Sequence, residues 1–456
     1  IREQAAWVHA NQKGVLEKAF DLVRAGVRKA ITAENSPMPA GVVNDSLLVV
    51  GGTVGGLTAA LAAAGRGVRV YLVVREDSLK ESLAVSGLYS AAGSSPDFVS
   101  ELRKKVEVHP LIELLSSARV TAAEGVPGNF LTEITASSGR RKITHGAVIL
   151  AGGTRWRSRQ GRLWAYKDIV KTQAEFGEIL NKGCLCDIKT VVFLPPLTPG
   201  TDEFSNYSRA GCAVALQNAA RAKYSLPDVN VYFLYQDMLV YGKDEKLYNE
   251  ARRDGVIFIR FESGAAPRVM EIAGGLQVEV TDNILGAPIV ISPDLLVMDT
   301  AAVSDFENMV LAGLFRAGLR KDGYFCEANA KFLPLDSNVA GVYLCGSARG
   351  PATLDEEVLQ GKAAAMGALT FLIKERPHVN KHIAEVDKKW CNGCGLCISA
   401  CPSGARSIDP ETRMAVVDRS TCLGCGACQA ACRSAATRQV NFSKKQILEV
   451  IDELLN

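Results

Sequence analysis

The sequence has few of the features that define several common classes of protein. Its formal net charge is only +3, from 52 basic and 49 acidic residues, so no general affinity for nucleic acid is implied. No Ser-His-Asp or paired-carboxylate arrangement stands out, and we assign no catalytic residue. The five histidines have no ligand-like spacing: His9, His109, His145, His378 and His382.

Long uncharged runs are also scarce. The longest covers residues 46–65, where glycines in a strand-turn-helix pattern argue against a membrane span, and no other candidate is present. The sequence begins at Ile1 with neither methionine nor a signal peptide, and we expect that the native protein starts further upstream. We expect a cytoplasmic location, with any membrane association made through a partner.

Thirteen cysteines are present, but they do not form a secreted disulfide framework. Eight fall into two runs near the C-terminal end. The other five are scattered, which fits a reducing compartment: Cys184, Cys186, Cys212, Cys326 and Cys345. We expect Cys345 and Cys326 to be buried, small apolar residues. Cys184 and Cys186 form a C-x-C pair, which is a weak signal for a redox or metal site.

The two cysteine runs both read C-x-x-C-x-x-C-x-x-x-C, the spacing typical of a bacterial ferredoxin with two [4Fe–4S] clusters. Three cysteines of each run bind one cluster and the fourth crosses to the other. The predicted ligands are therefore Cys391, Cys394, Cys397 and Cys432 for cluster one, and Cys422, Cys425, Cys428 and Cys401 for cluster two. The alternative is a pair of structural zinc sites, which usually show paired C-x-x-C units without the third and fourth cysteines.

Residues 46–74 predict the opening β-α-β unit of a dinucleotide-binding fold. An apolar strand at 47–50 meets a glycine-rich turn, and an Ala/Leu helix then leads to a second strand at 68–74. Such a turn lets a pyrophosphate bind at the N-terminus of the helix.

The glycine fingerprint of this unit is imperfect. Gly51 and Gly56 take its first and last glycine positions, but Thr53 replaces the middle glycine. Val74 stands where a ribose-binding acid is expected, and Glu76 follows two residues later. Two interpretations stay open, namely FAD binding and a nucleotide-type fold that has lost its nucleotide. The predicted FAD contacts are Gly51, Gly52, Thr53, Gly55, Gly56, Glu76, Val120, Gly346 and Gly350.

A second α/β unit is predicted at 185–300, and its first strand is followed by PPLTPGTD rather than a glycine fingerprint, so NAD(P)H binding is not favoured. The chain then returns to the first domain through a strand at 342–345 and a helix at 354–372. The predicted domains are an N-terminal helix and linker (1–44), the FAD-type domain in two parts (45–184 and 301–376), the NAD-like domain (185–300), a ferredoxin domain (384–438) and a C-terminal helix (439–456).

Several segments together carry a family resemblance: IREQAAWVH, HPLIELLSSARV, VYFLYQDMLVYG, DGYFCEANAKFLP and LCGSARGP. In this order of parts the chain resembles the heterodisulfide reductase A family over nearly its whole length. The resemblance implies a thioredoxin-reductase-like FAD domain, [4Fe–4S] clusters and partner redox subunits in a hetero-oligomeric complex. Some members of this family carry out flavin-based electron bifurcation.

The sequence departs from the family at several positions. Ala5 stands where the family usually has a cysteine tied to an N-terminal cluster, and Ala352 replaces a lysine on the flavin side. The cysteine-rich segment of the second unit keeps only Cys212. Together with Thr53 and Val74, these departures argue against electron bifurcation at this flavin, and they also weaken the prediction that FAD is bound.

These observations predict an α/β flavoprotein with two dinucleotide-binding domains and a C-terminal α+β ferredoxin domain. The predicted function is that of an oxidoreductase subunit which passes electrons between FAD and two [4Fe–4S] clusters, while partner subunits hold the substrate chemistry. The alternative is a flavin-free scaffold in which only the ferredoxin domain conducts electrons.

Overall fold

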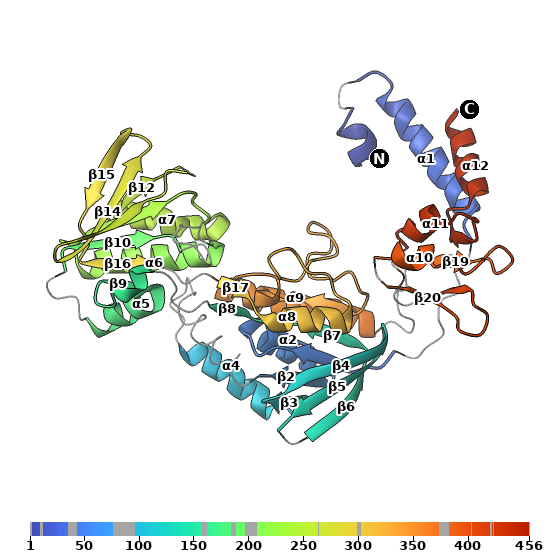
Figure 1. Ribbon diagram of the computed structural model, residues 1–456, viewed down its shortest axis with the longest axis horizontal. Coiled ribbons are helices and arrows are strands. Elements are labelled where there is room, and N and C mark those ends of the chain that lie inside the picture. The colour runs from blue at the N-terminus through green and yellow to red at the C-terminus, as the bar shows by residue number, and fades with distance from the viewer. Residues whose placement is uncertain are drawn as a thin grey trace. The chain divides into compact units, whose positions relative to one another are not determined.

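The computed structural model divides the chain into two units, shown in Figure 1. Unit 1 comprises Ile1–Val43, Gly125–Asn129 and Lys374–Asn456, and unit 2 comprises Asn44–Glu124 and Phe130–Ile373. The structure describes residues 2–9, 12–34, 43–75, 96–137, 139–156, 162–183, 188–196, 208–262, 264–298, 302–373, 383–402, 404–419, 422 and 424–455.

The FAD-type domain of unit 2 is built on a five-stranded parallel sheet. The strand order is β18-β7-β1-β2-β3, with bounds Val342–Leu344, Ala147–Leu150, Leu47–Val50, Val70–Val74 and Ile112–Ser116. Strands β18, β7, β1 and β2 are continuous apolar runs that are buried throughout, as a covered parallel sheet requires. The helices of this domain are α2 (Val54–Ala64), α4 (Pro96–Val108), α8 (Phe306–Phe315) and α9 (Leu354–Leu372), with the short 3-10 helix η4 (Gly346–Ala348).

Helices α2 and α9 approach each other closely because both carry a glycine at their crossing. A Cβ atom added to Gly361 would lie 2.4 Å from the carbonyl oxygen of Gly55. No larger residue fits at this crossing without moving the helices. The start of α2 and the first turns of α9 are therefore neighbours, which matters for the site described below.

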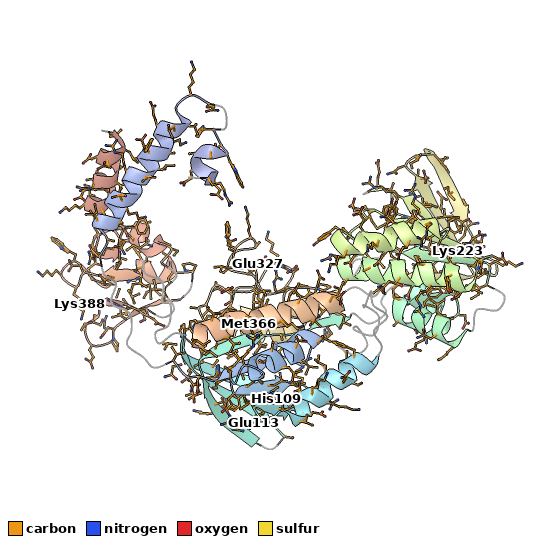
Figure 2. All side chains as sticks on the ribbon, turned by 180° about the vertical axis from the view of Figure 1, so that it is seen from behind. His109, Glu113, Lys223, Glu327, Met366 and Lys388 are labelled. Atoms are coloured by element: carbon orange, nitrogen blue, oxygen red, sulfur yellow. The ribbon has the colours of Figure 1, made fainter. Side chains whose placement is uncertain are left out.

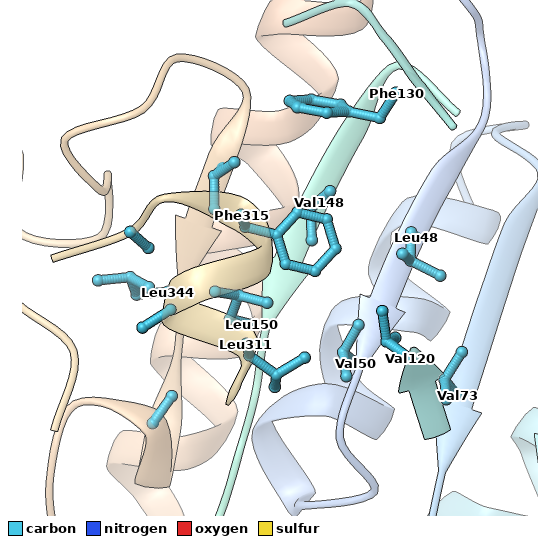
Figure 3. Packing of buried hydrophobic residues seen from close by; sticks show 14 of the residues in the cluster. Leu48, Val50, Val73, Val120, Phe130, Val148, Leu150, Leu311, Phe315 and Leu344 are labelled. Carbon is cyan, nitrogen blue, oxygen red and sulfur yellow. The ribbon is translucent and has the colours of Figure 1, made fainter. Parts of the chain in front are cut away.

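A three-stranded antiparallel sheet covers part of this domain, in the order β4-β5-β6, with bounds Arg119–Val126, Asn129–Ala136 and Gly139–His145. Its apolar side chains meet those of the parallel sheet and of α8 in one core (Figure 3). Val120 and Phe130 belong to this core, together with Val50 and Phe315. Glu113, labelled in Figure 2, lies on the edge strand β3 of the parallel sheet. It forms ion pairs with Arg69 and Arg141.

The second α/β domain repeats the same design. Its parallel sheet has the order β12-β11-β10-β16-β9, with bounds Ile257–Arg260, Asn230–Tyr235, Thr190–Leu194, Leu295–Met298 and Val170–Thr172. An antiparallel sheet adds β13 (Arg268–Ile272), β14 (Gly275–Asp282) and β15 (Ala287–Ile291). The helices are α5 (Gln173–Lys182), α6 (Arg209–Ser225), α7 (Glu245–Arg253), η2 (Arg162–Ala165) and η3 (Gly242–Asp244), and strands β8 (Thr154–Trp156) and β17 (Ala302–Ser304) pair with each other.

Unit 1 contains the ferredoxin domain and the helices near the two ends of the chain. The ferredoxin elements are β19 (Ala384–Val386), α10 (Leu396–Ser399), β20 (Arg406–Ile408), β21 (Ala415–Val417), α11 (Ala427–Ala431) and β22 (Thr437–Gln439), and β19 pairs with β22 while β20 pairs with β21. The terminal helices are η1 (Arg2–Ala6), α1 (Val15–Ile31) and α12 (Lys444–Leu455).

Helix α12 packs against α1 within unit 1. Two ion pairs join them, Arg24–Glu453 at 3.2 Å and Arg28–Glu449 at 3.7 Å. The start of α12 is capped by Ser443, whose hydroxyl accepts a hydrogen bond from the Gln446 N–H at 3.3 Å.

Two predictions about local structure were wrong, and two strands were missed. The single N-terminal helix predicted within residues 1–44 is divided into η1 and α1, because Gly14 adopts a left-handed φ of 89° and α1 begins after it. Strands β3 and β6 were not predicted. Cys326 is exposed rather than buried, because the preceding Tyr324 and Phe325 take the inward positions of this segment. Cys184 and Cys186 lie outside the described residues.

Among the residues that the structure describes, no helix has the length and apolar character needed to span a bilayer.

Candidate functional site

The glycine-rich turn between β1 and α2 is held tightly by its surroundings. Gly51 has a φ of 124°, and a Cβ atom there would lie 2.2 Å from the carbonyl oxygen of Ala151, which directly follows the neighbouring strand β7. A Cβ atom on Gly56 would lie 2.2 Å from the carbonyl oxygen of Gly51. The first and last glycines of the fingerprint are therefore required by close backbone approach, as in a dinucleotide-binding turn.

Thr53, which replaces the middle glycine, caps helix α2. Its hydroxyl oxygen accepts a hydrogen bond from the Gly56 N–H at 3.3 Å and donates to the Ala151 carbonyl at 3.2 Å. The hydroxyl thus uses one of the N–H groups at the helix N-terminus and ties the turn to β7. Gly52 beside it is buried.

A carboxylate that was not predicted as a site residue, Glu357 of α9, lies at the N-terminus of α2. Its Oε2 atom accepts a hydrogen bond from the Gly55 N–H at 2.6 Å, and its Oε1 atom accepts one from the Ser347 N–H at 2.7 Å. The hydroxyl of Ser347 also donates to Oε1. Burial raises the pKa of Glu357, while the hydrogen bonds from Ser347 and Gly55 oppose that rise.

The second predicted glycine pair lies around the same carboxylate. Gly346 has a φ of 55°, and a Cβ atom there would lie 2.3 Å from the Glu357 Oε2 atom. The Gly346 N–H donates to the Gln360 side chain at 2.9 Å. Cys345 is fully buried, and this burial raises the pKa of its thiol, as does the nearby charge of Glu357. Gly350 has a φ of 145°, and a Cβ atom added there would lie 3.5 Å from the Nη2 atom of Arg320.

The end of β2, where a ribose-binding acid is expected, presents a base. Val74 is buried, and the next residue, Arg75, forms ion pairs with Asp305 at 2.9 Å and with Glu307 at 3.1 Å. Among the described residues, the acids near this end of the sheet therefore come from the first turn of α8 and from its N-cap residue. Glu76 lies outside the described residues, and Val120 lies in the hydrophobic core; the assignment of both to FAD stays a prediction.

The structure thus brings most of the predicted FAD contacts to one place but adds an acid to them. The backbone of the turn fits a dinucleotide. However, the N–H groups of Gly55 and Gly56, which a pyrophosphate would use, donate hydrogen bonds to side-chain oxygens of Glu357 and Thr53. Sequence reasoning missed Glu357 because it ends the run Asp355-Glu356-Glu357, which is typical of an exposed first helical turn.

In the ferredoxin domain the two cysteine runs have matching environments. Short helices α10 and α11 begin after Gly395 and Gly426, which have left-handed φ values of 78° and 79°. The sulfur of Cys391 accepts a hydrogen bond from the Ala415 N–H at 3.4 Å. Its counterpart in the other run, Cys422, accepts one from the Ala384 N–H at the same distance. Such N–H donors stabilise thiolates and influence cluster potentials.

All eight cysteines of the two runs are free of disulfide bonds, and Cys397 and Cys428 are buried. Within the described ranges no three potential metal ligands are close enough together to hold an ion. The division of the cysteines into two ligand sets therefore stays the one predicted from their spacing.

A buried arginine accompanies these cysteines. Arg406 of β20 is only 4% exposed, and its Nη2 atom donates to the sulfur of Cys428 at 3.1 Å. Its Nη1 atom has no hydrogen-bond partner among the described residues. Sequence reasoning did not anticipate this contact, because an arginine in a short strand is more often exposed.

Comparison with known proteins identifies both parts. Residues 390–436 match the 4Fe-4S dicluster domain family, and residues 45–173 match the pyridine nucleotide-disulphide oxidoreductase family. Similar curated proteins include a heterodisulfide reductase A-like protein from Archaeoglobus profundus, 24% identical, with 89% of this chain and 77% of that protein aligned. An A-type iron-sulfur subunit of CoB–CoM heterodisulfide reductase from Methanopyrus kandleri is 27% identical, with 89% of this chain and 76% of that protein aligned.

The chain is similar to the A-type subunits of heterodisulfide reductase over most of its length. A third relative, the A-type subunit of the H2/formate:CoB–CoM heterodisulfide, ferredoxin reductase of Methanococcus maripaludis, aligns with 100% of this chain at 24% identity and with 84% of its own length. Among solved structures, thioredoxin reductase from T. acidophilum covers 72% of this chain and 99% of its own at 16% identity, with a TM-score of 0.47.

The homology and the domain matches confirm the predicted class. This heterodisulfide-reductase-A-like chain is an oxidoreductase subunit with a two-domain flavoprotein fold and a ferredoxin domain, and its cofactors are FAD and two [4Fe–4S] clusters. It is an electron-transfer subunit of the flavin and iron–sulfur type.

Proposed function

We propose that this chain passes electrons between an FAD in unit 2 and two [4Fe–4S] clusters in unit 1, within a complex of several redox subunits. The observation that carries the proposal is the presence in one chain of a dinucleotide turn, closed by Gly51 and Gly56, and of two complete cysteine runs. Bound flavin exchanges one or two electrons and a cluster exchanges one, so such a chain can join two-electron and one-electron carriers.

The residues of the chain hold and tune these centres. We assign cluster one to Cys391, Cys394, Cys397 and Cys432, and cluster two to Cys422, Cys425, Cys428 and Cys401. The N–H groups of Ala415 and Ala384 donate to one sulfur in each set and stabilise its charge. We assign the flavin to the backbone of the turn at residues 51–56 and of the segment at residues 346–350.

Partner subunits hold the substrate chemistry, because no catalytic constellation was found in the sequence and the relatives are named as subunits. We place the chain in the cytoplasm, since its cysteines form two cluster-binding runs and scattered single residues rather than a secreted disulfide framework, which fits a reducing compartment. Electron bifurcation at this flavin is not part of the proposal, because Ala5, Ala352 and Thr53 depart from the family pattern.

A second candidate is a scaffold whose nucleotide domain holds no flavin, so that only the ferredoxin domain conducts. The position of Glu357 at the N-terminus of α2 favours it. Acid extraction of flavin together with iron counting, on protein purified without oxygen, separates the two. About one FAD and about eight irons per chain support the relay. About eight irons without flavin would contradict it and support the scaffold.

A further inference from the structure

The N-terminus of α2 is the place where a dinucleotide fold binds the negative charge of its ligand. Free N–H groups and the helix dipole attract an anion there. In this chain the N–H of Gly55 donates to Glu357, and the N–H of Gly56 donates to Thr53. Two of the first three N–H groups of the helix are therefore used by side chains of the protein itself.

Glu357 has the chemistry of a substitute for phosphate. A buried carboxylate is stable only when donors satisfy it, and its two oxygens receive the N–H of Gly55, the N–H of Ser347 and the hydroxyl of Ser347. The same donors, from two different turns, would suit the oxygens of a pyrophosphate. Gly346 leaves room for the carboxylate, because a Cβ atom there would lie 2.3 Å from Oε2.

We propose that Glu357 occupies the pyrophosphate position of this domain and that FAD binds only when the carboxylate is displaced. The proposal rests on the assignment of this turn to FAD. When a binding-competent state is only fractionally populated, the apparent dissociation constant rises by the inverse of that fraction. The glutamate therefore weakens FAD binding by an internal competition, which a smaller or uncharged residue would relieve.

The test measures FAD binding to the full chain with its clusters intact, for the wild type, Glu357→Gln and Glu357→Ser. We expect both variants to bind FAD more tightly than the wild type. If the Glu357 carboxylate fills the pyrophosphate position in about nine-tenths of the molecules, its removal in the serine variant should lower the dissociation constant of FAD about tenfold. Asp355→Asn is the matched control, because it removes an exposed acid from the same turn of α9.

Two further ligands locate the competition. ADP carries a diphosphate and should gain affinity in the variants as FAD does, whereas riboflavin carries no phosphate and should gain none. Variants that bind FAD no tighter than the wild type, with about eight irons still present, overturn the proposal. An equal gain for riboflavin also overturns it, because the effect would then not lie at the pyrophosphate.

The outcome is separable from that of the electron relay. A wild type without flavin whose Glu357→Ser variant takes up FAD supports the internal competition and contradicts a relay in the resting chain. A wild type with about one FAD, unaffected by Glu357 variants, leaves the relay in place and refutes the competition.

A separate observation concerns Arg406. Burying a guanidinium is costly unless an anion accompanies it, yet its Nη1 atom has no partner among the described residues and its Nη2 atom donates to a cysteine sulfur. Four thiolates bound to a cluster supply negative charge beside it. Cys428, which accepts this hydrogen bond, is one of the ligands assigned above to cluster two.

We infer that Arg406 raises the reduction potential of cluster two, because a positive charge and an N–H donor at a ligand sulfur favour the more negative, reduced cluster. A redox titration followed by electron paramagnetic resonance tests this. Arg406→Met should shift the midpoint potential of one cluster to a more negative value, and Arg406→Lys should shift it less. Arg413→Met, which removes an exposed arginine of the same domain, should leave both potentials unchanged.

Unchanged or more positive potentials in Arg406→Met overturn this inference. If that variant does not retain its iron, Arg406→Gln replaces it, since glutamine keeps an N–H donor without the charge. If the glutamine variant has the same cluster potentials as the wild type, the charge of Arg406 does not raise the reduction potential, and the inference is wrong.

Discussion

Two buried charged residues of the molecule differ in how their hydrogen bonds are satisfied. At the N-terminus of α2, the carboxylate of Glu357 accepts hydrogen bonds from N–H groups of two turns. In the ferredoxin domain, the guanidinium of Arg406 donates to one cysteine sulfur, and its Nη1 atom has no partner among the described residues. The nucleotide domain therefore satisfies its buried charge with its own groups. The ferredoxin domain leaves charge and sulfur ligands that a cofactor must complete. We conclude that the buried charge beside the nucleotide turn is satisfied without a cofactor, whereas the buried charge in the ferredoxin domain is not.

Removal of the clusters should give the largest difference between the domains. The ferredoxin core is small, with Ala384, Cys397, Ala415 and Cys428 as its buried members, so metal binding contributes directly to its folding. After iron is chelated, we expect amide hydrogen exchange to increase throughout residues 383–442. Strands β1 and β7 of unit 2 should keep their protection and serve as the internal control. Equal protection of both regions after chelation would contradict the comparison.

Loss of a single ligand should remove one cluster rather than both. We expect Cys428→Ala to retain about four of about eight irons per chain, because Cys428 belongs to one predicted set only. Iron counting and the amplitude of the iron–sulfur absorbance measure this. Cys326→Ala is the matched control, since Cys326 is exposed and outside both runs, and it should keep all the iron. Full iron content in Cys428→Ala would show that the assigned ligand is wrong.

A substitution in the nucleotide turn should destabilise unit 2 and leave the iron content unchanged. Gly51→Ala places a Cβ atom 2.2 Å from a backbone oxygen at a φ of 124°, so we expect a loss of about 3 kcal/mol in the free energy of unfolding. Denaturant unfolding monitored by circular dichroism measures it. Gly153→Ala is the control, because a Cβ atom there meets nothing within 4 Å. Similar stabilities for the two variants would show that Gly51 is not required by its geometry.

Elements with a strong local pattern were predicted from the sequence. The strand Leu47–Val50 and the helix Leu354–Leu372 were predicted with the bounds that the structure gives them, because an apolar run and a helical period are local signals. Glycines 51 and 56 were predicted for the same reason, since a tight turn restricts which residues can occupy it.

The charged residues of the site could not be predicted in this way. Glu357 contacts Gly55 across 302 positions in the sequence, and its acidic neighbours resemble an ordinary exposed helix start. Arg406 is defined by the sulfur it contacts, and that contact depends on how β20 packs against α11. Contacts of this kind belong to tertiary packing, which composition and periodicity do not record.

The smallest expected effect is a pH dependence of unit 2 that arises from another internally satisfied group, His145. This side chain is fully buried, its Nδ1 atom contacts the Ala147 carbonyl at 3.0 Å, and its Nε2 atom contacts the Thr132 hydroxyl at 2.7 Å. Burial lowers the pKa of His145 to about 4, although the Ala147 carbonyl opposes the shift. The unfolded chain, with a histidine pKa of about 6.5, therefore binds the proton more readily than the folded chain.

The contribution of His145 to the free energy of unfolding is fully present above about pH 6.5. It decreases as the pH falls towards about 4, where His145 is protonated in the folded state as well. Between pH 7 and pH 5.5 we expect His145 to account for a loss of about 1 kcal/mol in the free energy of unfolding. Denaturant unfolding at both pH values, compared between the wild type and His145→Gln, isolates this contribution. Since the glutamine does not titrate, the variant should lose less stability over that range. An identical loss in both proteins would mean that His145 is protonated in the folded state, and unit 2 would then contain a buried charge that its own groups do not satisfy.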